Sequence, residues 1–179
     1  MKYNYTSHDG NRGKYWKMQN GVFQTTYMSQ SQDWWRDAVT MELSNDGTRL
    51  YTSETWEGDS YNAGWSTVNT TTGSRTHWSD MGWDQRVLAM AMDPNTGILY
   101  GGVGSHYSSV NPRGHLVRFN NPDSTHSWTS LSTYFTGSTN WQITEMAVDG
   151  DFIFLSTGDH YNSGQEAEFW RYQISTGSM

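Results

Sequence analysis

Three segments of this chain repeat one pattern, and the repeat constrains the fold more than any other feature of the sequence. Each segment has an apolar run, a turn that combines Gly with Asn or Asp, and a second apolar run. Met41, Met90 and Met146 occupy the same place in the first run. The three segments are residues 39–53, 88–102 and 144–156. Apolar runs joined by such a turn are typical of a β-hairpin, because Gly adopts positive φ at little cost. The sequence therefore predicts the same hairpin three times.

A third run follows each hairpin, and a fourth run follows the first two. The third runs are residues 65–69, 116–120 and 168–172, and the fourth are 76–79 and 127–131. Runs at residues 3–7, 14–18 and 22–27 fit the last three places of the same unit. Naming the runs A to D, we expect units at about 1–32, 38–82, 87–139 and 143–179, with a further C–D turn at 175–177. The second and third units are complete, and the outer two are partial.

The composition favours an all-β protein with a core rich in aromatic residues and Met. The chain has 10 Trp, 11 Tyr and 9 Met, while Leu, Ile, Val and Phe are too few for a large aliphatic core. Aromatic and β-branched residues suit a pleated, half-buried surface. Trp, Tyr and Met must therefore fill much of the interior.

A spacing of roughly fifty residues lies in the range of propeller blades and solenoid units. With four strands per unit, the chain resembles β-propeller repeat proteins. The resemblance implies an all-β β-propeller of four-stranded antiparallel blades, incomplete in this chain, with two full blades flanked by two partial ones. The chain has neither an Asp-box nor a WD40 signature. Residues 68–78 are similar to the strand–Thr-Gly–Trp pattern of quinoprotein-type blades. This pattern occurs clearly only once in the sequence, so no propeller subfamily is assigned. Because the sequence starts and stops in the middle of a blade, we expect either that it is an excerpt of a longer polypeptide or that partner chains complete the ring.

Charge and composition exclude several classes of partner. The net charge of -7 argues against nucleic acid, which requires a basic face. The chain has no Cys, so neither a disulfide framework nor a thiolate metal site is possible. No apolar run reaches membrane-spanning length, so membrane insertion is not expected. The few lysines and abundant Ser, Thr, Asn and Gly favour an extracellular or virion-surface protein, although the N-terminus lacks the apolar core of a signal peptide.

Two sets of loops carry the candidate ligand-binding residues. The propeller resemblance implies that B–C and D–A loops emerge on one face. The B–C loops share a polar and aromatic motif, with Asp59, Tyr61, His106, Tyr107, Asp159, His160 and Tyr161. The D–A loops share Trp, at Trp34, Trp35, Trp83 and Trp141. Exposed aromatic rings beside a few polar groups make a binding surface, and they suit carbohydrate in particular. The alternative interpretation is that the Trp residues pack between blades and that the Asp and His residues cap their own turns.

Signals for catalysis or metal binding are weaker. The six histidines show no metal-ligand spacing, and no cofactor motif is present. Residues 93–97 lack the alternating acids of a calcium loop and predict a hairpin turn. No Gly-x-Ser-x-Gly elbow occurs, so no catalytic residue is assigned. Carboxylates such as Glu54, Glu57, Asp59 and Asp159 could supply a glycosidase pair, but the sequence does not give their separation.

The sequence leaves three functions open. The first is a non-catalytic propeller module that binds carbohydrate or another surface ligand, because the candidate residues repeat whereas a catalytic centre is asymmetric. The second is a structural component of an extracellular or virion appendage, assembled with other copies or further blades. The third is a fragment of a propeller glycosidase or lyase.

Overall fold

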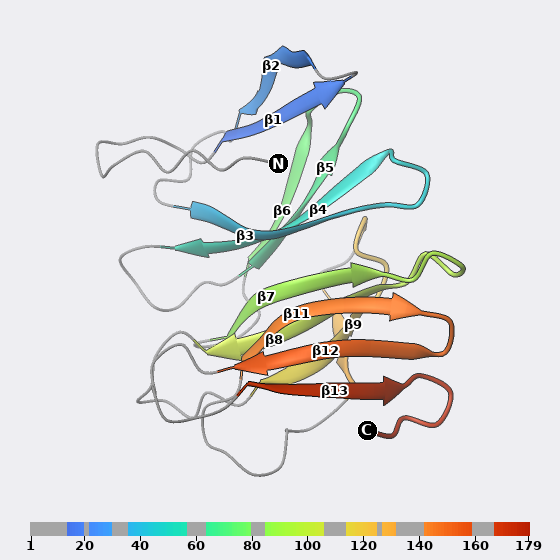
Figure 1. Ribbon diagram of the computed structural model, residues 1–179. Coiled ribbons are helices and arrows are strands. Elements are labelled where there is room, and N and C mark those ends of the chain that lie inside the picture. Colours follow the sequence, from blue (N-terminus) through green and yellow to red (C-terminus); the bar gives the residue numbers. More distant parts are fainter. Residues whose placement is uncertain are drawn as a thin grey trace.

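The computed structural model describes residues 14–19, 22–29, 36–56, 64–79, 85–105, 114–124, 127–131, 142–158 and 167–179. These residues form antiparallel β-sheets, and no helix occurs among them (Figure 1). The all-β prediction is therefore confirmed for the described part of the chain.

The strands form four sheets in chain order. A hairpin contains β1 (Lys14–Gln19) and β2 (Val22–Ser29). The first sheet contains β3 (Arg36–Leu43), β4 (Arg49–Trp56), β5 (Gly64–Asn69) and β6 (Arg75–Ser79). The central sheet contains β7 (Gln85–Met92), β8 (Leu99–Ser105), β9 (His115–Phe119) and β10 (Trp128–Ser130). The last sheet contains β11 (Gln142–Asp149), β12 (Phe152–Gly158) and β13 (Glu168–Gln173).

The predicted strand order A to D is confirmed in the first and central sheets, where each strand pairs with the next. The last sheet has the predicted A, B and C strands, and β1 and β2 correspond to the predicted C and D strands. The run at 3–7 lies outside the described residues. Strands β3, β7 and β11 begin before the predicted apolar runs, because ladder pairing uses backbone groups and continues past the apolar side chains.

The predicted hairpin turns are also confirmed. Gly47, Gly97 and Gly150 have φ angles of 72°, 71° and 58°, so each uses the left-handed conformation that glycine adopts most easily. Residues 93–97 connect β7 to β8, as the sequence predicted. Gly177 has a φ of 68° in the turn that follows β13, at the predicted C–D turn.

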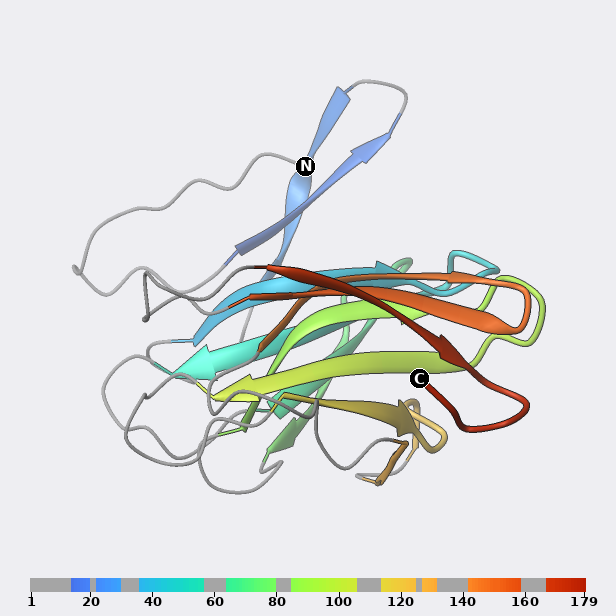
Figure 2. The same ribbon diagram turned by 60° about the horizontal axis from the view of Figure 1, so that its bottom comes forward.

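The three larger sheets lie in succession along the molecule. Strand β7 contacts β3 on one side and β11 on the other, so the first strands of the sheets run side by side (Figures 1 and 2). In Figure 2 the β1–β2 hairpin extends away from these sheets, and neither of its strands contacts another described strand. The central sheet is therefore enclosed between its two neighbours.

Most of the core forms two layers, one on each face of the central sheet, and a smaller cluster of Leu50 and Val68 with Met41 lies on the other face of the first sheet. The side chains of β8 point alternately into the two layers. Leu99 and Val103 belong to the cluster shared with the first sheet. Tyr100 belongs to the cluster shared with the last sheet. All three side chains are almost fully buried. Met90 and Met146 lie in or against these clusters, so Met fills the interior as the composition predicted.

Two glycines of β8 leave room for neighbouring side chains, Gly102 for one from the last sheet and Gly101 for one from β9 of the same sheet. A Cβ on Gly102 would lie 2.6 Å from the Cβ of Ile143 in the last sheet, and a Cβ on Gly101 would lie 2.8 Å from the ring of Phe119. Real Cβ atoms do not approach that closely, because cores are already packed at crystal-like density. The Gly101–Gly102 pair therefore gives the neighbouring side chains direct access to the backbone of β8.

Strands β3, β7 and β11 each carry a β-bulge at the same place in the repeat. The register shifts between Ala38 and Met41 in β3, and β7 and β11 have one extra residue each, Leu88 and Thr144. A bulge bends the strand and increases its twist. The bulges could not be predicted from the sequence, since an extra residue leaves the apolar pattern of the strand almost unchanged.

Candidate functional site

All of the predicted ligand-binding residues lie outside the described residues. They fall in the segments 30–35, 57–63, 80–84, 106–113, 132–141 and 159–166. The residues concerned are Trp34, Trp35, Asp59, Tyr61, Trp83, His106, Tyr107, Trp141, Asp159, His160 and Tyr161. What the structure does describe is the set of strand ends next to these segments.

These strand ends lie on one side of the stacked sheets. Arg36 pairs with Trp56, so the start of β3 and the end of β4 are neighbours. The other inner pairs are the same, with Gln85 opposite Ser105 and Gln142 opposite Gly158. In Figure 1 these ends lie on the left, and the β3–β4, β7–β8 and β11–β12 turns lie on the right. We call the two sides the loop end and the turn end.

Buried polar side chains support the loop end. Gln142 begins β11 and is 8% exposed, and Thr157 and His115 lie near the same end and are similarly buried. The ring of His115 lies 5.7 Å from that of Trp128 in a tilted arrangement. Buried polar groups satisfy their hydrogen bonds inside the protein. These residues are therefore packed inside the protein beside the strand ends.

The turn end is held together by hydrogen bonds between sheets. The Asn45 side chain donates to the carbonyls of Asp93 at 3.0 Å and Pro94 at 2.9 Å, which joins two consecutive hairpin turns. Burial by itself would raise the pKa of Asp93, but hydrogen bonds from the Thr96 hydroxyl and from the N–H groups of Asn95 and Thr96 outweigh it and lower the pKa. The Asp93 carboxylate therefore serves its own turn.

Two other carboxylates of the turn end, Asp46 and Asp151, also accept hydrogen bonds from neighbouring turn residues. The Thr48 N–H and the hydroxyls of Ser44 and Thr48 lower the pKa of the exposed Asp46 to about 2. Asp151 accepts from the Ser175 hydroxyl at 2.5 Å and from the Gln173 amide at 2.9 Å, and these bonds lower its pKa. A carboxylate that is saturated by its own loop is a cap. The described turns therefore make a structural end of the molecule.

Glu42 is a titratable group between the first and central sheets. Its Oε1 accepts a hydrogen bond from the Met92 N–H at 3.1 Å. Burial raises the pKa of Glu42, and the bond from Met92 opposes this only in part. A carboxyl group with a raised pKa is a candidate acid or base in a cleft. Here its oxygen accepts a hydrogen bond from the backbone of β7 in the central sheet, so it joins two sheets.

A second link between these sheets is centred on Asp123, in the β9–β10 turn. The Tyr51 hydroxyl donates to Asp123 Oδ1 at 3.2 Å, and Arg49 Nε lies 3.7 Å from the same oxygen. The Thr67 hydroxyl donates to the carbonyl of Pro122 at 2.9 Å. Burial, and then the charge of Asp123, raises the pKa of Tyr51. The phenol therefore stays protonated and acts as a donor.

The described residues contain no cluster of three or more His, Asp or Glu side chains that could hold a metal ion. Over the same residues, no helix is long and apolar enough to cross a membrane. Comparison of the sequence with protein-family models and with curated proteins finds no match.

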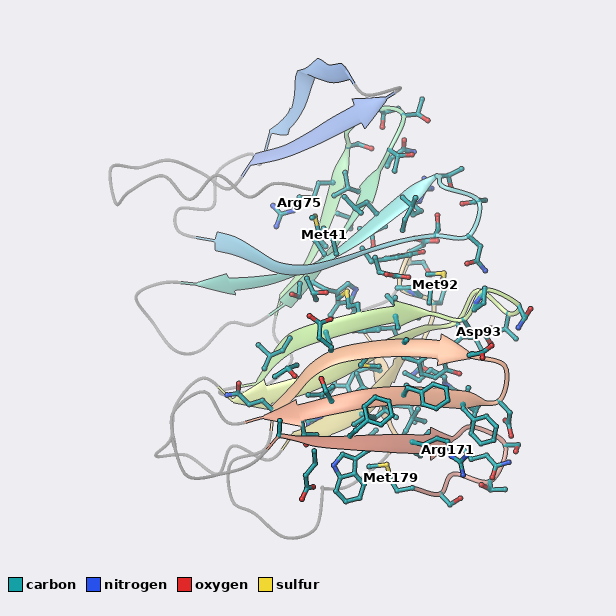
Figure 3. The ribbon with its side chains drawn as sticks, in the orientation of Figure 1. Met41, Arg75, Met92, Asp93, Arg171 and Met179 are labelled. Atoms are coloured by element: carbon teal, nitrogen blue, oxygen red, sulfur yellow. The ribbon has the colours of Figure 1, made fainter. Side chains whose placement is uncertain are left out.

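The structure shows a surface that the sequence analysis missed, on the outer face of the last sheet. Phe169 is 72% exposed, and its ring stacks on that of Phe154 with 6.1 Å between centroids. Phe152 lies 6.3 Å from Phe154, and the Arg171 guanidinium lies 4.7 Å above the Phe152 ring (Figure 3). The alternation of Phe152 and Phe154 was a usable signal, but the sequence does not tell which face of a sheet is left uncovered.

Proposed function

We propose that the chain is a non-catalytic binding module of β-propeller design, which recognises carbohydrate or another surface ligand through aromatic-rich B–C and D–A loops. The observation that carries the proposal is the common placement of the strand ends. Each segment with a predicted binding residue is joined to strand ends at the loop end, as the pairs Arg36–Trp56, Gln85–Ser105 and Gln142–Gly158 indicate.

The propeller part of the proposal is supported by the order of the sheets. Strands β3, β7 and β11 are first in their sheets and contact one another in sequence. In a propeller the first strand of each blade lies nearest the axis, and the blades pack face to face. The buried clusters on both faces of the central sheet fit this packing.

The non-catalytic part of the proposal is supported by how the described titratable groups are used. Asp46, Asp93 and Asp151 cap turns, and Glu42 joins two sheets. The candidate binding residues instead repeat from unit to unit, and repeated weak sites act together by avidity.

A glycan array tests the proposal. We expect the wild-type protein to bind a defined set of glycans, and we expect Trp34→Ala, Trp83→Ala and Trp141→Ala each to weaken binding to that set. Trp128→Ala is the matched control, because Trp128 is partly buried against the core between the first and central sheets. Circular dichroism verifies that every variant is folded.

Two results would reject the proposal. One is the absence of glycan binding by the folded protein together with turnover of a glycoside or polysaccharide in a substrate screen, which would favour a hydrolase or lyase. The other is unchanged binding in all three loop variants, which would move the ligand site away from the loop end.

A further inference from the structure

The outer face of the last sheet is open, although the corresponding face of the two preceding sheets is covered. Trp65, Leu116 and Phe169 occupy equivalent places in β5, β9 and β13, because each pairs with the equivalent residue of the preceding strand. Trp65 and Leu116 are 0% exposed, whereas Phe169 is 72% exposed. Among the described strands, the last sheet contacts only β7, β8 and β9, through its other face.

An aromatic ridge runs along the middle of this open face. Strand β12 is the central strand of the last sheet. Its Phe152 and Phe154 point outward, since they alternate with the buried Ile153 and Leu155. The Phe154 ring stacks on the Phe169 ring of β13 with 20° between the planes. We call Phe152, Phe154 and Phe169 the aromatic ridge, and uncovered apolar surface of this kind marks a protein interface.

Charges of opposite sign lie on the two sides of the ridge. On β11, Glu145 and Asp149 are exposed on the outer face, where Asp149 pairs with Phe152. On β13, the exposed Arg171 places its guanidinium 4.7 Å above the Phe152 ring (Figure 3). Within the described part of the chain, neither acid forms an ion pair with Arg171. The face therefore has acids along one edge and a cation along the other.

This order of charges makes the face complementary to itself. A twofold axis parallel to β12 places β12 of one copy over β12 of the other, and β11 of each copy over β13 of the other. Asp149 and the Arg171 guanidinium both lie at the level of Phe152 along the strands, so this axis brings them together twice. An axis across the strands would instead place β11 over β11, with acid facing acid. Opposite charges fix the orientation of an interface, because like charges that face each other are costly.

We propose that two copies of this chain associate through the outer faces of their last sheets, about a twofold axis parallel to β12. The aromatic ridges meet in the centre, and Asp149 of each copy lies against Arg171 of the other. Such a contact is isologous, since it uses one patch twice and closes at a dimer. Aligned packing of two sheets face to face is a common arrangement. The proposal is independent of ligand binding at the loop end, and it excludes a further sheet on the same face.

Sedimentation equilibrium tests the proposal. Phe169→Glu places a carboxylate in the ridge, and Arg171→Glu makes the charges at both edges of the contact alike. Thr71→Glu is the matched control, since Thr71 is exposed in the β5–β6 turn. We expect wild type and the control to dimerise equally, and each of the other variants to dimerise about tenfold or more weakly, the size of a hot-spot loss.

A charge swap within one chain gives the decisive measurement. Adding Asp149→Arg to Arg171→Glu should restore most of the lost affinity, because the two charges exchange places and remain opposite across the axis. If acids faced acids, the swap would leave like charges together and restore nothing. A monomeric wild type up to its solubility limit, equal dimerisation of wild type and Phe169→Glu, or a swapped variant as weak as Arg171→Glu would each overturn the proposal. Circular dichroism verifies that the variants are folded.

Discussion

The Cβ that Gly102 lacks would lie 2.6 Å from the Cβ of Ile143. Ile143 is fully buried and belongs to the cluster between the central and last sheets. Because both atoms sit on backbone-proximal positions, neither can move without shifting a strand. The distance between β8 and β11 is therefore set by a missing side chain.

Gly102→Ala should lower the free energy of unfolding by about 1–3 kcal/mol, because the methyl group overpacks the core. Urea denaturation of the variant measures the loss. Adding Ile143→Ala should recover only part of it, since Ala removes the Cγ2 contact and keeps the Cβ contact, and the two changes should then differ from additivity by more than about 0.5 kcal/mol. Strictly additive losses would show that Gly102 and Ile143 do not limit the approach of the strands.

Asn45→Ala should cost about 1 kcal/mol of stability, because two donated hydrogen bonds to the carbonyls of Asp93 and Pro94 are lost. Asn45→Asp should cost more, since its carboxylate would face two carbonyl oxygens and cannot donate. Thermal unfolding of wild type and the two variants ranks their stabilities. If the Asp variant were as stable as wild type, the link between the turns would not contribute to folding.

Burial raises the pKa of Tyr51, Tyr100 and Tyr172 in the folded protein. Since a raised pKa means that the folded state holds the proton more tightly, this stabilisation is complete below the ordinary tyrosine pKa of 10.0. This stabilisation is lost as the pH rises through the raised pKa values that these tyrosines have in the folded protein. We expect the tyrosinate absorbance of these residues to appear together with alkaline unfolding.

Tyr51→Phe should remove one of these late-titrating groups from the absorbance titration. It should also cost about 1 kcal/mol at neutral pH, because the bond to Asp123 is lost. A folded protein in which all tyrosines titrate with ordinary values would contradict the burial of these phenols.

Glu42→Gln tests the carboxyl group between the first and central sheets. The raised pKa of Glu42 means that its protonated form favours the folded state, so this stabilisation is present below the ordinary glutamate pKa of 4.5 and is lost as the pH rises through the folded pKa. Gln keeps an acceptor for the Met92 N–H and does not ionise. The variant should match wild type in acid and exceed it at neutral pH by at most about 1 kcal/mol, since Glu42 is half-exposed. Chemical denaturation across this pH range measures the difference, and a variant that is weaker at neutral pH would refute the assignment.

Much of the strand pattern could be predicted from the sequence, because it depends on local features. Gly47, Gly97 and Gly150 occupy turns that need positive φ, and the apolar runs on either side can bury a face only as strands. The bulges at Leu88 and Thr144 could not be predicted, because a bulge depends on how two strands pair.

The candidate site could be predicted only as a set of recurring loop residues. Their flanking strand ends share one side, as Arg36–Trp56 and Gln142–Gly158 show, and this agrees with the expected loop geometry. The positions of the loop residues themselves, such as Trp83, remain predictions, since these residues lie outside the described part of the chain.

The sequence by itself determined that this chain forms repeated antiparallel hairpins, because turn conformation and the alternation of apolar residues are local properties. Only the tertiary structure decided what becomes of each face. Trp65 and Phe169 occupy the same place in the repeat, yet one is fully buried and the other is exposed. The physical reason is that burial requires a second sheet, and the residues of a strand do not by themselves indicate whether a second sheet packs against it.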